Sequence, residues 1–300
     1  MTALGTPGAA APAGTAPVGT AAARARGRRC TVDAAGLPVT CTVWGQGDEP
    51  VLLVPDLAGA PVADHGAFLV PALARRHEVV GIDPVEPPAD RPLRLDDLVQ
   101  QLASAVEQAA AGRPVAVVGS SLGAAAGAAL AAARPDLVAH LVLVAGWLVP
   151  SATHRLHARV WRTLHDERSA ALPEHVVGAV HDEAYLAQRS PADLAALAAA
   201  VPTDRFARRL VDLAVATDLT DVLPRVHAPT LVVGATQDRL VTEPQSRALF
   251  AALPDSRYLA VRAGHAVAVE RPAELAWAVE SFLADPGRYP AGTILPVALP

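Results

Sequence analysis

Short, mostly apolar runs alternate along the chain with longer segments in which apolar residues recur every three or four positions. The apolar runs predict strands buried on both faces, at 51–54, 78–82, 115–118, 140–144, 230–234 and 258–261. The periodic segments predict helices, at 67–76, 95–111, 124–133, 244–252 and 273–283. Because strands that alternate with helices pair in parallel, the pattern predicts an α/β fold with a mostly parallel, doubly wound sheet.

A different pattern precedes the first buried strand. Residues 30–33 and 39–44 are separated by a short turn segment containing Gly36, which predicts an antiparallel hairpin. In that hairpin Cys30 lies opposite Cys41. A disulfide between them is geometrically conceivable, but two reduced thiols are favoured in a cytoplasmic protein.

The alternation also breaks once in the middle of the chain. Residues 148–223 contain no strong strand and predict an insertion of short helices, interrupted at Pro173, Pro191 and Pro202. The core of the domain then comprises 30–147 and 224–284. Residues 1–29, rich in Ala, Gly, Pro and Thr, predict a disordered tail, and 285–300 predict an extended C-terminal tail.

Composition narrows the classes of function. An apolar share of 52% supports a sizeable core, and a net charge of −5 gives no electrostatic reason to expect nucleic-acid or anionic-membrane partners. The chain has no lysine, which excludes a Schiff-base or P-loop lysine. No apolar run reaches the ~18 residues of a membrane-spanning helix. In a secretory signal the basic residues precede the apolar stretch, whereas here they follow it. We therefore expect a cytoplasmic protein that acts on a small molecule; a homo-oligomer remains open.

The segment Gly119-Ser120-Ser121-Leu122-Gly123 has the form G-x-S-x-G and stands between a predicted strand and a predicted helix. The two glycines allow a sharp turn that lifts Ser121 above the edge of the sheet, where it could act as a nucleophile. Ser120 occupies the variable position of the motif and is the weaker candidate for the nucleophile. A serine hydroxyl is a weak nucleophile, so the motif needs a base and an orienting acid.

Both partners follow in the chain. Asp238 and His265 each come shortly after a predicted strand, where open α/β sheets place their ligands. Because Ser121, Asp238 and His265 occur in this order, the chain resembles the α/β-hydrolase superfamily over residues 38–284. The resemblance implies a catalytic triad of these three residues and a helical cap formed by 148–223. Asp218 and Asp221 are the rival carboxylates.

The resemblance also implies an oxyanion hole built from two backbone N–H groups, those of Leu122 and Leu57. The loop that carries Leu57 departs from the usual His-Gly, because it reads Pro55-Asp56. Three interpretations of Asp56 are open. It braces the loop from outside, it enters the pocket in protonated form and acts on the substrate, or it weakens the oxyanion hole by charge repulsion.

Aromatic residues near or within the insertion are candidates for the substrate pocket. They are Trp147, Trp161, Tyr185 and Phe206, and the alternative for the last three is that they pack the core of the cap. The five histidines of the insertion invite a metal hypothesis, but solvated surface histidines explain them better: His154, His157, His165, His175 and His181. We expect neither metal nor cofactor, since a G-x-G-x-x-G dinucleotide fingerprint is also absent.

These features predict a serine-dependent hydrolase that cleaves an ester, thioester or related acyl bond of a small, mostly apolar molecule. One alternative is a non-hydrolytic enzyme of the same fold, such as a cyclase, a lyase or a C–C bond-cleaving enzyme of specialised metabolism. The other is a non-catalytic binding protein of the same fold.

Overall fold

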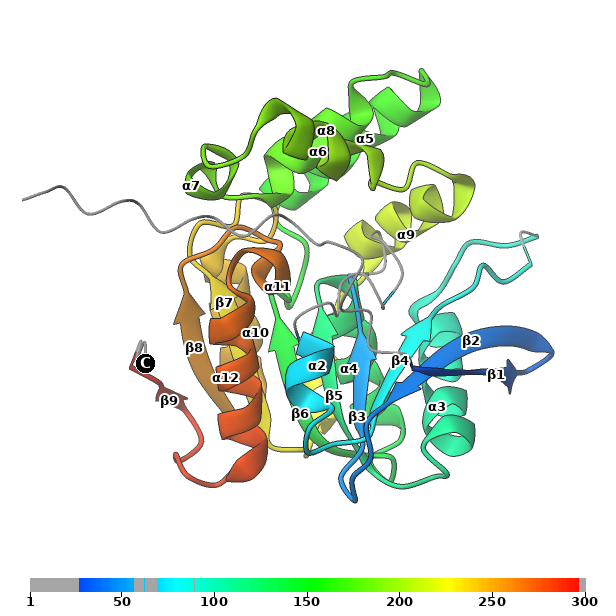
Figure 1. Cartoon of the computed structure of the whole chain (residues 1–300), viewed down its shortest axis with the longest axis vertical. Coiled ribbons are helices and arrows are strands. Elements are labelled where there is room, and N and C mark those ends of the chain that lie inside the picture. Colours follow the sequence, from blue (N-terminus) through cyan, green and yellow to red (C-terminus); the bar gives the residue numbers. More distant parts are fainter. Residues whose placement is uncertain (1–26, 57–61, 63–68, 89, 297–300) are drawn as a thin grey trace, which may run out of the picture.

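A computed structural model describes residues 27–56, 62, 69–88 and 90–296. Over these residues the strands form a single nine-stranded sheet in the order β1-β2-β4-β3-β5-β6-β7-β8-β9 (Figure 1). The strands are β1 (Arg28–Ala34), β2 (Leu37–Trp44), β3 (Val51–Val54), β4 (Val79–Asp83), β5 (Val115–Ser120), β6 (Val138–Val144), β7 (Thr230–Ala235), β8 (Ser256–Val261) and β9 (Thr293–Ile294).

From β4 to β9 every neighbouring pair of strands is parallel, whereas β2 is antiparallel to both β1 and β4. The α/β fold with a mostly parallel sheet is thereby confirmed. The hairpin register is confirmed too, because Cys30 pairs with Cys41, and both thiols are free. The Cys41 thiol is buried, which together with the neighbouring Cys30 and Asp83 raises its pKa to about 12.

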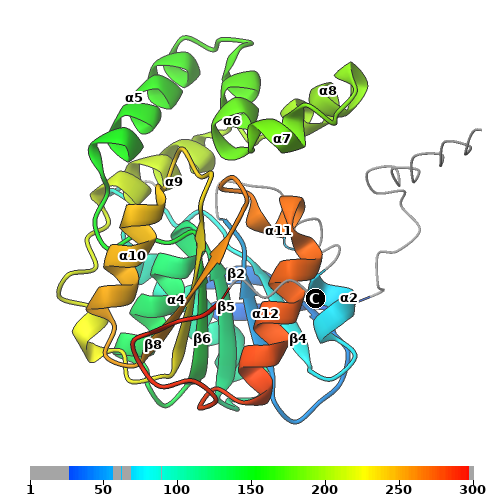
Figure 2. The ribbon, with the colours of Figure 1, turned by 90° about the vertical axis from the view of Figure 1, so that its left-hand side faces the viewer.

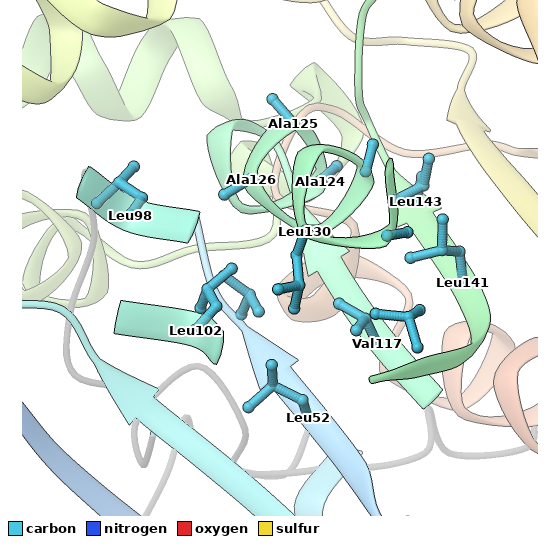
Figure 3. Close-up of a cluster of buried hydrophobic side chains, with 14 of the residues drawn as sticks. Leu52, Leu98, Leu102, Val117, Ala124, Ala125, Ala126, Leu130, Leu141 and Leu143 are labelled. Atoms are coloured by element: carbon cyan, nitrogen blue, oxygen red, sulfur yellow. The ribbon is translucent and has the colours of Figure 1, made fainter. Parts of the chain in front are cut away.

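Helices cover both faces of the sheet (Figure 2). On one face α3 (Leu95–Ala109), α4 (Leu122–Ala133) and α10 (Glu243–Ala252) pack against a large apolar cluster, part of which is shown in Figure 3. On the other face α2 (Leu69–Leu73) and α12 (Pro272–Ala284) cover a second cluster. Nearly all of α4 is buried, which its Ala-Gly sequence permits because small side chains let a helix approach a sheet closely.

Five α-helices are inserted between β6 and β7 and lie beyond the carboxyl ends of the central strands (Figure 1). We call them the inserted helices: α5 (Ala152–Asp166), α6 (Leu172–Val180), α7 (Glu183–Leu186), α8 (Pro191–Ala199) and α9 (Arg205–Ala216). Pro173 and Pro191 lie in the first turns of α6 and α8, where a missing N–H costs no hydrogen bond. They therefore begin helices here as well as separating them.

The chain ends differ in part from the expectation. β1 begins at Arg28, inside the stretch predicted as a tail, and residues 1–26 lie outside the described part. The C-terminal stretch is not simply an extended tail, because β9 pairs in parallel with β8 and the Leu295 N–H donates to the Tyr258 carbonyl. A two-residue strand gives no periodic signal in the sequence. None of the helices described is long and apolar enough to cross a lipid bilayer.

Candidate active site

Ser121 stands at the sharp turn between β5 and α4. Its backbone has φ 55° and ψ −122°, a conformation that costs a non-glycine residue about 1–3 kcal/mol. The turn is tight because a Cβ on Gly119 would lie 2.5 Å from the Gly123 carbonyl oxygen, and one on Gly123 only 2.3 Å from the Pro55 carbonyl oxygen. The two glycines of the motif thus bring Ser121 and the loop after β3 to the same edge of the sheet.

His265 connects this serine to a carboxylate. Its Nε2 lies 2.8 Å from Ser121 Oγ, and its Nδ1 lies 2.7 Å from Asp238 Oδ2. The other oxygen of Asp238 accepts hydrogen bonds from the backbone N–H groups of Leu240 and Val241. An ionised carboxylate only accepts, so Nδ1 carries the proton and Nε2 is free to accept the hydroxyl hydrogen of Ser121.

The groups around the His265 ring stabilise its protonated form relative to a free histidine. Burial opposes the charge, but the Asp238 carboxylate, with smaller contributions from Asp56 and Glu270, outweighs burial and raises the pKa of His265 above its usual value. A base with a raised pKa accepts the serine proton more readily. The same shift means that the ring is already protonated at mildly acidic pH, where it cannot act as a base.

The rival residues lie elsewhere. Asp218 and Asp221 are exposed, and the Asp218 carboxylate accepts a hydrogen bond from the N–H of Thr220. Ser120 lies on the wall of the same cavity as Ser121, but it is Ser121 that contacts His265.

Of the two expected oxyanion donors, the structure describes one. Leu122 is the first residue of α4, so its N–H has no acceptor within the helix, and the residue lies on the cavity wall. Leu57 lies outside the described residues. Pro55 and Asp56 precede it, and both line the cavity.

A cavity of about 410 Å³ lies over Ser121, between the carboxyl edge of the sheet and the inserted helices. Its walls are mostly apolar, and Trp161 contributes to them. The other three aromatic candidates do not line it. Trp147 is in the core with its Nε1–H donating to the Thr217 carbonyl, Tyr185 stacks on His181, and Phe206 packs against the main apolar cluster.

The histidines of the inserted helices correct the sequence analysis. The prediction of solvated surface residues is wrong for His154 and His181, each only 5% exposed, and both line the cavity together with the less buried His157 and His175. Burial, the largest cause, lowers the pKa of His154 to about 4, so this ring is neutral at pH 7. Within the described part of the chain, no three or more His, Cys, Asp or Glu residues are grouped as a metal site would need.

Glu270, which the sequence analysis missed, ties the inserted helices to the loop of His265. Its fully buried carboxylate accepts hydrogen bonds from the N–H of Gly264 at 2.8 Å, the N–H of Asp182 at 2.9 Å and Nδ1 of His181 at 3.1 Å. Burial opposes ionisation, yet these bonds hold the pKa of Glu270 below its usual value. Glu270 is the last residue of the short helix α11 (Val267–Glu270), and no local pattern distinguishes it from other surface acids.

Comparison with known proteins agrees with the geometry. The family model described as serine aminopeptidase, S33, matches residues 93–271. A relative in Escherichia coli strain UMN026, provisionally named carbamate hydrolase RutD, is 33% identical over 240 residues, which cover 75% of this chain and 84% of that protein. Pyrrolizixenacetamide deacetylase of Xenorhabdus hominickii is 25% identical over 246 residues, 79% of this chain and 92% of that protein.

Solved structures share the fold. The enol-lactonase of Burkholderia xenovorans LB400 superposes with a TM-score of 0.74 at 23% identity, covering 86% of this chain and 100% of the other. An esterase of Thermogutta terrifontis superposes with a TM-score of 0.72 at 20% identity, covering 86% and 99%. At this sequence identity the structural similarity shows the shared fold and nothing about activity. Taken with the family model and the relatives, it shows that the chain is an enzyme of the α/β-hydrolase superfamily and belongs to the family described as serine aminopeptidase, S33.

Proposed function

We propose that this protein is a serine-dependent hydrolase of an ester, thioester, amide or carbamate bond in a small, mostly apolar molecule. The observation that carries the proposal is the continuous contact from Ser121 Oγ through the His265 ring to Asp238. Such a chain makes a serine nucleophilic because the imidazole takes its proton as the new bond forms.

In the first half of the reaction, Ser121 Oγ attacks the acyl carbon while its proton passes to His265 Nε2. The carbonyl oxygen becomes an oxyanion that the Leu122 N–H stabilises. The bond to the leaving group then breaks, and the leaving group takes the proton from His265. In the second half, a water molecule gives a proton to His265 and attacks the acyl-enzyme, which releases the acid and restores Ser121.

The cavity supports the proposed class of substrate. A volume of about 410 Å³ accommodates a small organic molecule, and its mostly apolar walls favour an apolar acyl group or leaving group. Two relatives are named as a carbamate hydrolase and as pyrrolizixenacetamide deacetylase, and these names support extending the proposal from esters to C–N acyl bonds.

A fluorophosphonate probe with intact-mass detection tests the proposal. The wild-type protein and a Ser120→Ala variant are expected to take up one probe molecule, while Ser121→Ala takes up none. Turnover of para-nitrophenyl acetate is expected to fall about a thousandfold or more in Ser121→Ala. Turnover of that ester without labelling of Ser121 would overturn the proposal and favour an acid–base role on a non-hydrolytic path.

A further inference from the structure

His181, on the cavity wall, belongs to a second histidine–carboxylate pair that the proposed reaction does not use. His181 Nδ1 lies 3.1 Å from Glu270 Oε1, with the His181 side chain 6% exposed and the Glu270 side chain fully buried. One face of the His181 ring stacks on Tyr185, with centroids 4.8 Å apart and ring planes inclined by 19°. The ring therefore has a fixed position and a fixed orientation.

The pairing determines which nitrogen of His181 carries a proton. Glu270 also accepts the N–H groups of Gly264 and Asp182, so its carboxylate is surrounded by donors and stays ionised. An ionised carboxylate can only accept, so the hydrogen of this pair sits on His181 Nδ1. In the neutral ring, Nε2 is then a lone-pair acceptor.

Nε2 is the ring atom of His181 that remains available to a ligand. Among the hydrogen bonds of the described residues, none reaches His181 Nε2, and His181 lines the cavity over Ser121. A fixed polar atom on a mostly apolar wall favours a ligand that supplies the missing hydrogen bond.

The rest of the lining points to an uncharged ligand. No arginine is among the lining residues that the structure describes, and the sequence has no lysine. Asp56 adds a carboxylate to the wall, and His154 is neutral. Among the described lining residues, an anionic group on the substrate would find no arginine or lysine to pair with, whereas an N–H or O–H donor finds an acceptor.

We propose that His181, held by Glu270, is a specificity-determining residue whose Nε2 accepts a hydrogen bond from an N–H or O–H group of an uncharged substrate. The inference rests on the hydrolysis proposed above and narrows its substrate to acyl compounds that carry such a donor away from the reacting carbonyl.

The test compares pairs of esters that differ in one donor. The para-nitrophenyl esters of N-acetylglycine and levulinic acid have the same chain length, with N–H in one where the other has CH₂. The esters of N-acetyl-β-alanine and its keto counterpart move the donor by one methylene. The ratio of kcat/KM within each pair is measured at pH 8 for wild type, His181→Asn and His165→Asn.

Asparagine at 181 keeps an N–H donor for Glu270 and removes the acceptor at the Nε2 position, because its amide oxygen is bonded to Cγ itself and lies nearer the backbone. His165 provides the matched control, since its Nδ1 also lies 3.1 Å from a carboxylate, that of Asp166, but outside the cavity lining. In at least one pair the preference for the N–H ester is expected to be about fivefold or more in wild type and His165→Asn, and lost in His181→Asn.

An equal ratio in wild type and His181→Asn for both pairs, with all the esters hydrolysed, would overturn the inference and leave the proposed function standing. Failure of wild type to hydrolyse any of them would contradict the proposed function and the inference with it. If His181→Asn does not fold, the inference is tested instead by inhibition of the wild-type enzyme with two amides, one with an N–H group and one without. N-butylacetamide must inhibit at least fivefold more tightly than N-butyl-N-methylacetamide, and equal inhibition overturns the inference.

Discussion

The Glu270 carboxylate accepts the backbone N–H of Gly264 at 2.8 Å, and Gly264 is the residue immediately before His265. A Cβ at position 264 would lie 2.5 Å from the Asp182 nitrogen, so only glycine lets this loop approach the inserted helices so closely. The N–H of Ala266, on the other side of His265, donates to the Val180 carbonyl. The position of the imidazole is thus set jointly by the sheet edge and by the inserted helices.

Replacement of Glu270 by glutamine should change the pH dependence of the enzyme. Glu270 contributes to the raised pKa of His265, so Glu270→Gln is expected to lower that pKa. His265 must be unprotonated to accept the Ser121 proton, and activity is therefore lost as pH falls through this pKa. The acidic midpoint of kcat/KM should move to lower pH in the variant, and kcat should fall about tenfold because an amide cannot satisfy all three donors.

The control for this experiment is Glu274→Gln, whose carboxylate lies 3.7 Å from Arg271 and is 29% exposed. It is expected to keep the wild-type midpoint. A midpoint in Glu270→Gln that is unchanged or moved to higher pH would contradict the claim that the Glu270 charge raises the pKa of His265.

Gly123→Ala should destabilise the protein severely. Its Cβ would meet the backbone oxygens of Pro55 and Val54 at 2.3 and 2.5 Å, so α4 or the loop after β3 must move. We expect a loss of about 3 kcal/mol or more in the free energy of unfolding. Gly178→Ala is the matched control, because it also lies in a helix but meets no atom within 4 Å, and it should gain up to about 1 kcal/mol. Denaturant unfolding measures both; similar values for the two variants would contradict the close approach.

Asp56→Asn should make the enzyme faster with simple esters. Asp56 and Leu122 line the same cavity, so the aspartate charge opposes the negative charge that develops on the substrate oxygen. The asparagine variant is expected to raise kcat for para-nitrophenyl acetate at pH 8 by up to about tenfold. Its acidic midpoint should also fall, because Asp56 contributes to the raised pKa of His265. Slower turnover in Asp56→Asn would favour a loop-bracing or substrate-binding role for the carboxylate.

The fold was accessible from the sequence because its strands are buried on both faces and therefore read as continuous apolar runs. The same runs mark where strands end, and the parallel arrangement brings those ends to one edge, which explains how Ser121, Asp238 and His265 could be singled out. The hairpin register followed from the symmetry of positions 30 and 41 about a short turn.

The sequence could not predict features that depend on which face of a helix is buried against the rest of the protein. His154 and His181 look like surface residues in an Ala-rich helical stretch, and only the position of the inserted helices over the sheet buries them. Glu270 became recognisable only when the fold placed it between Gly264 and Asp182, which are far apart in sequence. β9 is too short to produce a pattern of its own.

The most direct measurement of the central claim is the identity of the acylated atom during turnover. A rapid-quench reaction with para-nitrophenyl butanoate, followed by peptide mapping, should show a burst of nitrophenol equal to the enzyme concentration and a butanoyl group on Ser121. The same reaction with Ser121→Ala should show neither. Steady turnover without an acyl-enzyme, or a butanoyl group on Ser120 in place of Ser121, would contradict the mechanism.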